Sequence, residues 1–125
     1  MNYNYINTEY LDSVSDGNVE IMAELVSMFR DQVAETVIEM KSLLDKKDYY
    51  SLGLLAHKAK SSVLIMGMSD LGALLKTFEL QAKDGSEAEK YESYIDRFDH
   101  DTAEAVKELD DLVNNRLTKK INDQY

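Results

Sequence analysis

One histidine in this sequence has neighbours that could support chemistry on its ring. His57, Lys60 and Ser61 are spaced as i, i+3 and i+4, so in a helix they share one face. A neutral imidazole is a nucleophile near neutral pH, because its unperturbed pKa is about 6.5. A lysine one turn away can neutralise an arriving phosphoryl group, and a small residue beside it leaves room. The spacing suggests phosphoryl transfer, with an ordinary surface histidine as the alternative.

The helix that carries His57 is expected over residues 48–66. At about 100° per residue, the apolar positions predict a core stripe centred between Leu55 and Ala59. His57 falls almost opposite that centre. The histidine is therefore predicted to point away from the core.

Apolar residues are also predicted on the outward face around the histidine. They are Leu54, Leu64 and Ile65. A folded domain gains little from apolar side chains that face water, so the patch indicates a docking surface for another protein. Lys58 and Lys60 add local positive charge that would suit an acidic partner site.

Apolar residues recur every three or four positions through most of the chain, which is the spacing of amphipathic helices. Asn18 and Asp48 are candidate N-caps, Gly67 can end a helix, and Ser86 with Glu89 has the pattern of a capping box. Helices are expected at roughly residues 8–14, 18–45, 48–66, 69–84 and 86–118. Short connections predict an all-α fold: an antiparallel up-down-up-down four-helix bundle with a short extra N-terminal helix, as a single domain over 1–125.

Composition narrows the possible functions. The 125 residues include no proline, which favours helix, and no cysteine, which excludes disulfides and thiol catalysis. The formal net charge is −10 and the pI is near 4.6, so binding to nucleic acid or to an anionic membrane is not expected. The polar N-terminus does not look like a signal peptide, and we expect a soluble, cytoplasmic monomer.

The segment from Ala56 to Gly67 resembles the sequence motif of histidine-phosphotransfer domains. In that motif Ala-His is followed by an apolar residue, a lysine, small residues and a glycine. The matching positions here are Ala56, His57, Ala59, Lys60, Ser62 and Gly67. Further similar positions are Asp16-Gly17, Phe29, Asp48-Tyr49, Leu71 and Glu79. Ser61 replaces the usual glycine after the lysine.

The resemblance implies a phosphocarrier in a two-component phosphorelay. His57 would accept a phosphoryl group from an aspartyl phosphate on a receiver domain and pass it to another receiver. Lys60 would stabilise the transferred charge, and Glu79 would hydrogen-bond and orient the imidazole, as a glutamate does in some family members. The alternative for Glu79 is a surface ion pair with Lys76 or Lys83, at i−3 and i+4.

The same resemblance implies no cofactor in this chain, since the magnesium ion needed for transfer would sit in the receiver. The partners would be response-regulator receiver domains, with that of a hybrid sensor kinase as one option. No glycine-rich Walker loop is present, so neither ATP binding nor kinase activity is expected.

Two alternative classes of function are a helical adaptor and a di-metal enzyme. A helical adaptor could bind a partner through the Leu54, Leu64 and Ile65 face without chemistry. A di-metal enzyme would need Glu-x-x-His pairs, and neither His57 nor His100 is preceded by glutamate at that spacing. His100 with Asp96 and Glu104 is at best a weak metal face, and no metal site is predicted.

Overall fold

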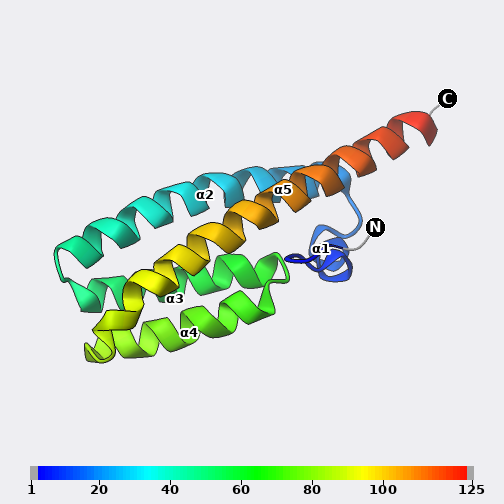
Figure 1. The fold of residues 1–125 in the computed structure, drawn as a ribbon. Coiled ribbons are helices and arrows are strands. Elements are labelled where there is room, and N and C mark those ends of the chain that lie inside the picture. The colour runs from blue at the N-terminus through cyan, green and yellow to red at the C-terminus, as the bar shows by residue number, and fades with distance from the viewer. Residues whose placement is uncertain (1–2, 124–125) are drawn as a thin grey trace.

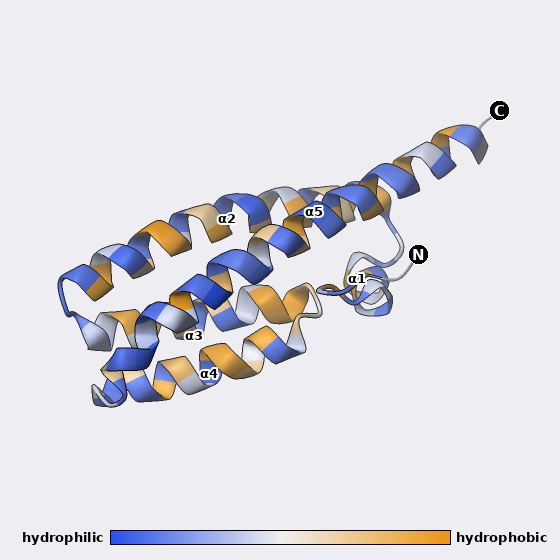
Figure 2. Ribbon diagram, in the orientation of Figure 1, coloured by the Kyte–Doolittle hydropathy of each residue, from blue (hydrophilic) through white to orange (hydrophobic). Residues whose placement is uncertain are grey.

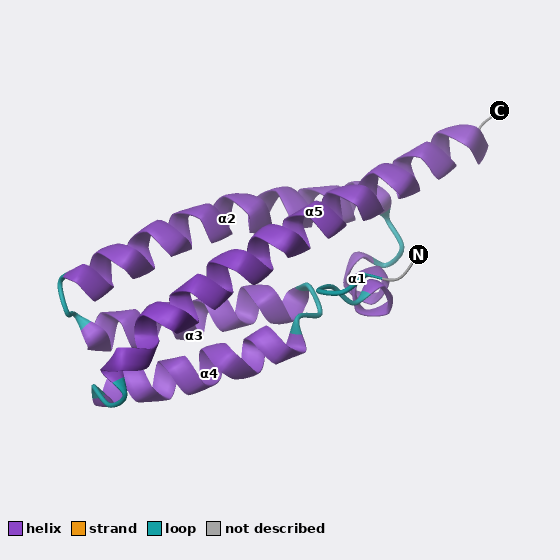
Figure 3. Cartoon of the chain, viewed as in Figure 1, coloured by secondary structure: helices purple, strands orange, loops and turns teal. Residues whose placement is uncertain are grey.

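The computed structural model describes residues 3–123, and helices are the only regular elements within them (Figure 3). The helices are α1 (Thr8–Ser15), α2 (Val19–Asp45), α3 (Tyr49–Ile65), α4 (Ser69–Asp84) and α5 (Tyr91–Asp123), and a short 3-10 turn (Ala88–Lys90) precedes α5. The predicted all-helical class is confirmed. No helix in this part of the chain is long and apolar enough to cross a membrane.

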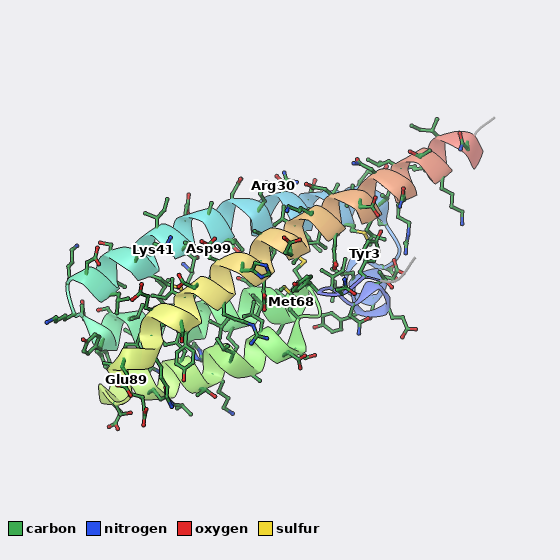
Figure 4. The ribbon with its side chains drawn as sticks, viewed as in Figure 1. Tyr3, Arg30, Lys41, Met68, Glu89 and Asp99 are labelled. Atoms are coloured by element: carbon green, nitrogen blue, oxygen red, sulfur yellow. The ribbon has the colours of Figure 1, made fainter. Side chains whose placement is uncertain are left out.

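The four long helices lie lengthwise beside one another (Figure 1). In Figure 1 the chain follows α2, comes back along α3, runs out again along α4 and returns along α5, while α1 lies at one end. The ion pairs Arg30–Asp110 and Lys41–Asp99 join α2 to α5, and Figure 4 labels Arg30, Lys41 and Asp99 along these two helices. Helices α3 and α4 make the most extensive contact of any pair.

Side-chain caps fix where the helices begin. The Asn18 Oδ1 atom accepts a hydrogen bond from the Ile21 amide at 3.0 Å, and the Asp48 Oδ1 atom accepts one from the Ser51 amide at 3.3 Å. Both predicted N-caps are therefore confirmed. Gly67 follows α3 with φ of +77°, the left-handed conformation predicted for it.

The last helix begins later than the sequence suggested. We predicted a start at residue 86 with a capping box of Ser86 and Glu89, but α5 starts at Tyr91 and no side chain caps the turn before it. Gly85 and Glu87 both have positive φ, at +69° and +61°, and such angles interrupt a right-handed helix. The Tyr91 hydroxyl instead lies within hydrogen-bond distance of two backbone carbonyl oxygens, those of Gln81 in α4 and Ser86 in the connection.

The buried stripe of α3 includes Ala59, as predicted, but it is turned from Leu55 towards Ala56. Its fully buried apolar residues are Leu52, Ala56 and Val63, with Ala59 close to them in burial. Leu55, predicted beside the centre, is only half-buried. Figure 2 shows large hydrophobic stretches on α3 and a mainly hydrophilic α5, and α3 contacts α4, α2 and α1.

Two glycines allow α3 and α4 to approach closely. A Cβ atom on Gly53 of α3 would lie 2.8 Å from Lys83 Cγ and 3.0 Å from both the Glu79 carbonyl oxygen and the Lys83 backbone nitrogen. A Cβ atom on Gly72 of α4 would lie 2.6 Å from Leu64 Cδ2. The backbones therefore pack where larger residues would hold them apart.

The N-terminal segment ties α1 to the end of the bundle. The Glu108 carboxylate of α5 accepts hydrogen bonds from the backbone amides of Asn4, Tyr5 and Ile6 at 2.8, 2.9 and 3.3 Å. Arg116 donates to both carboxylate oxygens of Asp12, at 2.6 and 3.1 Å. These contacts fix the end of α5 to the start of the chain.

Gly53→Ala should destabilise the protein although alanine is the better helix former. The propensity gain is about 1 kcal/mol, while the new Cβ meets backbone atoms of α4 that cannot rotate away, and overpacking costs about 1–3 kcal/mol. Chemical denaturation followed by circular dichroism measures the difference. Gly72→Ala is the control, because its closest contact is a side-chain end that can rotate, and it should cost less. A more stable Gly53→Ala protein would contradict the close approach.

Candidate functional site

His57 lies in the middle of α3 with its side chain 57% exposed. Its Nδ1 atom is 2.9 Å from the Oε1 atom of Glu79 on α4. An ionised carboxylate can only accept hydrogen bonds, so the ring proton is assigned to Nδ1. In the neutral ring the lone pair is then on Nε2. The predicted outward position of His57 is confirmed by this exposure.

Glu79 is a buried acid with three cationic or proton-donating neighbours. Its side chain is 9% exposed, and its carboxylate contacts His57, Lys60 Nζ at 3.6 Å and Lys83 Nζ at 2.8 Å. The Lys83 ammonium, followed by the hydrogen bond from His57, lowers the pKa of Glu79 to about 2 although burial opposes the change. The carboxylate is therefore ionised at neutral pH.

Glu79 contacts one partner from each of the two interpretations offered for it. It accepts a hydrogen bond from the His57 imidazole, and it also pairs with Lys83 at i+4. Among the ion pairs of residues 3–123, none joins Glu79 to Lys76. Because Glu79 is buried, the pair with Lys83 differs from the exposed surface pair that the spacing alone suggested.

Lys60 is less exposed than its position on the helical wheel implied. Its side chain is 22% exposed, and its ammonium lies on the same oxygen of Glu79 that faces His57. The lysine thus lies one turn along α3 from the imidazole, within the same charged group.

The remaining residues predicted for the site lie on the outer face of α3. Lys58 and Ser61 are exposed. In the described part of the chain the Ser61 hydroxyl makes no hydrogen bond, whereas its neighbour Ser62 donates to Gln32 Oε1 of α2 at 3.3 Å. Ser61 is therefore available to a group arriving at His57.

The three apolar residues predicted for docking are also exposed. They are Leu54, Leu64 and Ile65, at 48%, 41% and 40%. Leu64 in addition lies against Gly72 of α4, so part of its surface is already covered. The patch is thus continuous with the contact between α3 and α4.

His100 has a different environment on α5. Its Nδ1 atom is 3.0 Å from Oδ1 of the buried Asp101, whose Oδ2 accepts a hydrogen bond from Arg97 at 2.9 Å. Asp96 and Glu104 do not join it: across residues 3–123 no three His, Asp or Glu side chains gather in a cluster able to hold a metal ion. The two histidines are therefore not equivalent.

Sequence reasoning missed the positions that bring the site together. The sequence predicts Lys83 only as an alternative surface partner of Glu79 and assigns no role to Gly53. A glycine in the interior of a predicted helix was the available signal for Gly53, since glycine is unfavourable there unless packing requires it.

The helical fold agrees with a comparison of the sequence against protein families. Residues 24–117 match the model of the Hpt domain, and the chain belongs to this family. Hpt domains are phosphocarriers of two-component phosphorelays, and they interact with the receiver domains of response regulators. No curated protein and no solved structure matches the chain.

The Glu79 carboxylate should make the stability of the domain depend on pH. Because its pKa is lowered from 4.5 to about 2 in the folded protein, its contribution is present above pH 4.5 and is lost as the pH falls towards 2. Glu79→Gln should reduce the free energy of unfolding at neutral pH by about 1–3 kcal/mol and flatten this acid dependence. Urea denaturation at a series of pH values measures both effects.

Glu24→Gln, an exposed acid of α2, is the control and should keep the acid dependence of the original protein. An unchanged pH profile in Glu79→Gln would contradict the carboxylate's ionised, paired state.

Proposed function

We propose that this Hpt domain carries a phosphoryl group on His57. It accepts the group from an aspartyl phosphate on one receiver domain and passes it to another. The single observation that carries the proposal is the imidazole itself. Its Nδ1–H faces a buried, ionised Glu79, and its ring is exposed with the lone pair on Nε2.

The transfer is a displacement at phosphorus. The Nε2 lone pair attacks, the Nε2–P bond forms, the bond between phosphorus and the aspartyl oxygen breaks, and the electron pair leaves on the receiver's carboxylate. Nδ1 keeps its proton throughout, so the phosphorylated ring carries positive charge. The Glu79 carboxylate at 2.9 Å stabilises that charge more in the transition state and product than in the neutral ring. The reverse reaction delivers the group to the next receiver.

Lys60 and Ser61 supply the remaining interactions with the phosphoryl group. Lys60 offers an ammonium one turn from the ring, which neutralises part of the phosphoryl charge. Ser61 is small and exposed, and its hydroxyl can donate to a phosphoryl oxygen. The chain needs no cofactor of its own for these steps, and the magnesium ion belongs to the receiver.

The receiver docks on the exposed face of α3. Leu54, Leu64 and Ile65 provide apolar area around His57, and Lys58 provides charge for an acidic partner site. Helix α3 contains no aspartate or glutamate, although the chain has 24 of them. An acidic receiver site therefore meets no like charge from this helix.

The proposal also includes the extent, topology, location and oligomeric state of the domain. The domain spans residues 1–125, forms an up-down-up-down bundle, acts as a cytoplasmic monomer and has no kinase activity. A receiver of a hybrid sensor kinase is one candidate donor. The exposed face would equally serve a non-catalytic adaptor, and phosphorylation of His57 separates the two functions.

His57→Gln should abolish labelling by a phosphorylated receiver, because the amide has no nucleophilic ring nitrogen. The measurement is acid-labile incorporation of phosphate, tested over a panel of receivers from the same cell. His100→Gln is the matched control and should label normally. Labelling that persists in His57→Gln but disappears in His100→Gln would contradict the assignment, and no labelling of the unaltered chain by any receiver would favour the adaptor.

Leu64→Asp should weaken receiver binding by about tenfold or more, since it puts a charge into the apolar docking face. Its effect on the free energy of unfolding should stay near 1 kcal/mol, because Leu64 is 41% exposed although it packs against Gly72 of α4. Titration calorimetry and thermal melts measure the two quantities.

Two further variants complete this test. Ile38→Asp, at a 70% exposed residue of α2, should leave binding unchanged, whereas Leu52→Asp, at a fully buried residue, should unfold the domain. Equal losses of binding in Leu64→Asp and Ile38→Asp would contradict the docking face.

A further inference from the structure

The carboxylate of Glu79 is divided between two tasks. Oε1 faces the His57 ring at 2.9 Å, and Oε2 faces the Lys83 ammonium at 2.8 Å. Lys83 is on α4, the helix of Glu79 itself, and none of the hydrogen bonds and ion pairs within residues 3–123 joins it to the imidazole. The hydrogen-bonded route from the Lys83 ammonium to His57 therefore runs through the carboxylate.

The route of the Lys83 side chain depends on a residue of the other helix. Its Cγ lies where a Cβ on Gly53 would be, with only 2.8 Å between them. Gly53 is buried and precedes His57 by one helical turn. The absence of a side chain on α3 thus leaves space for the aliphatic stem of Lys83 to lie between the helices and reach a buried carboxylate.

We propose that Lys83 is a positioning residue for His57, and that Gly53 is the gap in α3 that admits it. The proposal deepens the proposed function, on which it rests. Lys83 holds Oε2 and thereby keeps Oε1 on the imidazole. The ring is then fixed with its proton on Nδ1 and its lone pair on Nε2, ready for phosphorus.

The position of Lys60 explains why the Oε2 partner matters. Lys60 Nζ is already 3.6 Å from Oε1, the oxygen used by His57. Without Lys83, Oε2 would be a buried anionic oxygen with no partner, which is costly. Lys60 is the nearest remaining cation and would move onto the carboxylate. It would then displace the ring and be withdrawn from the phosphoryl group.

The groups that face Glu79 are few and can be separated by mutation. They are His57 and Lys60 on α3 and Lys83 on α4. Lys83 is the largest cause of the lowered pKa of Glu79, ahead of His57. Lys76, also on α4 and exposed, carries the same charge three residues before Glu79 and is the matched control.

The experiment compares Lys83→Met, Lys83→Arg and Lys76→Met with the unaltered full chain. Methionine keeps an unbranched stem against Gly53 and removes the charge. Nitrogen-15 spectra of the His57 ring report the fraction with the proton on Nδ1, and carbon-13 titration reports the pKa of the Glu79 carboxyl. Phosphoramidate serves as the phosphoryl donor, so no receiver is involved: Nε2–P forms, the P–N bond of the donor breaks and ammonia leaves. Phosphorus-31 spectra follow the rate.

In Lys83→Met the Nδ1–H fraction should fall, the pKa of Glu79 should rise from about 2 towards its ordinary value, and phosphorylation should slow by about tenfold. Lys83→Arg should restore the Nδ1–H fraction and the rate. Lys76→Met should change neither the Nδ1–H fraction of His57 nor the pKa of Glu79. Thermal melts show that each variant is folded. The proposal would be overturned if Lys83→Met kept both the Nδ1–H fraction and the phosphorylation rate of the unaltered chain. It would also be overturned if the Nδ1–H fraction changed and the rate did not.

Failure of the proposed function is separable from failure of this inference. A chain in which phosphoramidate and receivers never label His57 is not a phosphocarrier, whatever Lys83 does. The spectra of the His57 ring and the Glu79 carboxyl are recorded without a phosphoryl donor. Even in a chain that is never phosphorylated, an unchanged Nδ1–H fraction in Lys83→Met would therefore overturn the positioning role.

Discussion

The site depends on one interaction, the burial of an ionised carboxylate between two helices. Glu79 is almost inaccessible to water, so its charge is tolerated only because His57, Lys60 and Lys83 surround it. Two of these neighbours come from α3 and one from α4. The same contacts that satisfy the charge therefore fix the relative position of the helices and the orientation of the reactive ring, so stability and chemistry cannot be separated at this residue.

That arrangement requires two helices to lie closer than ordinary side chains permit. Gly53 removes the Cβ that would meet Lys83 and the backbone of α4, and Gly72 removes the one that would meet Leu64. Glycine lowers the stability of an isolated helix, and here the loss is offset by packing and by the charged contacts that the approach allows. Gly53 leaves room for Lys83 beside the carboxylate that contacts His57, and Gly72 leaves room for Leu64 of the apolar surface.

The sequence predicted the helical class because apolar spacing and N-caps are local properties, and it brought His57 and Glu79 together through a family resemblance. It centred the α3 core stripe between Leu55 and Ala59 because a helical wheel treats each helix alone. In the protein several neighbours cover α3, and Ala56 is buried while Leu55 is not fully covered. The late start of α5 comes from the positive φ of Glu87, and a glutamate gives no sign of such a backbone angle in the sequence. The set of side chains that contact the Glu79 carboxylate is likewise fixed by tertiary packing, so local sequence patterns do not predict it.

Local charge explains how a chain of net charge −10 can attract an acidic partner. At physiological ionic strength charges are screened beyond about 8 Å, so a docking partner responds to the nearest side chains more than to the total. Helix α3 has lysines and no acids, and the one acid that α4 adds to the site, Glu79, is buried and paired. The remaining acids lie mostly on α2 and α5. In the proposed docking these acids would repel an acidic receiver from α2 and α5 and leave the α3 face, with His57, as the least unfavourable approach.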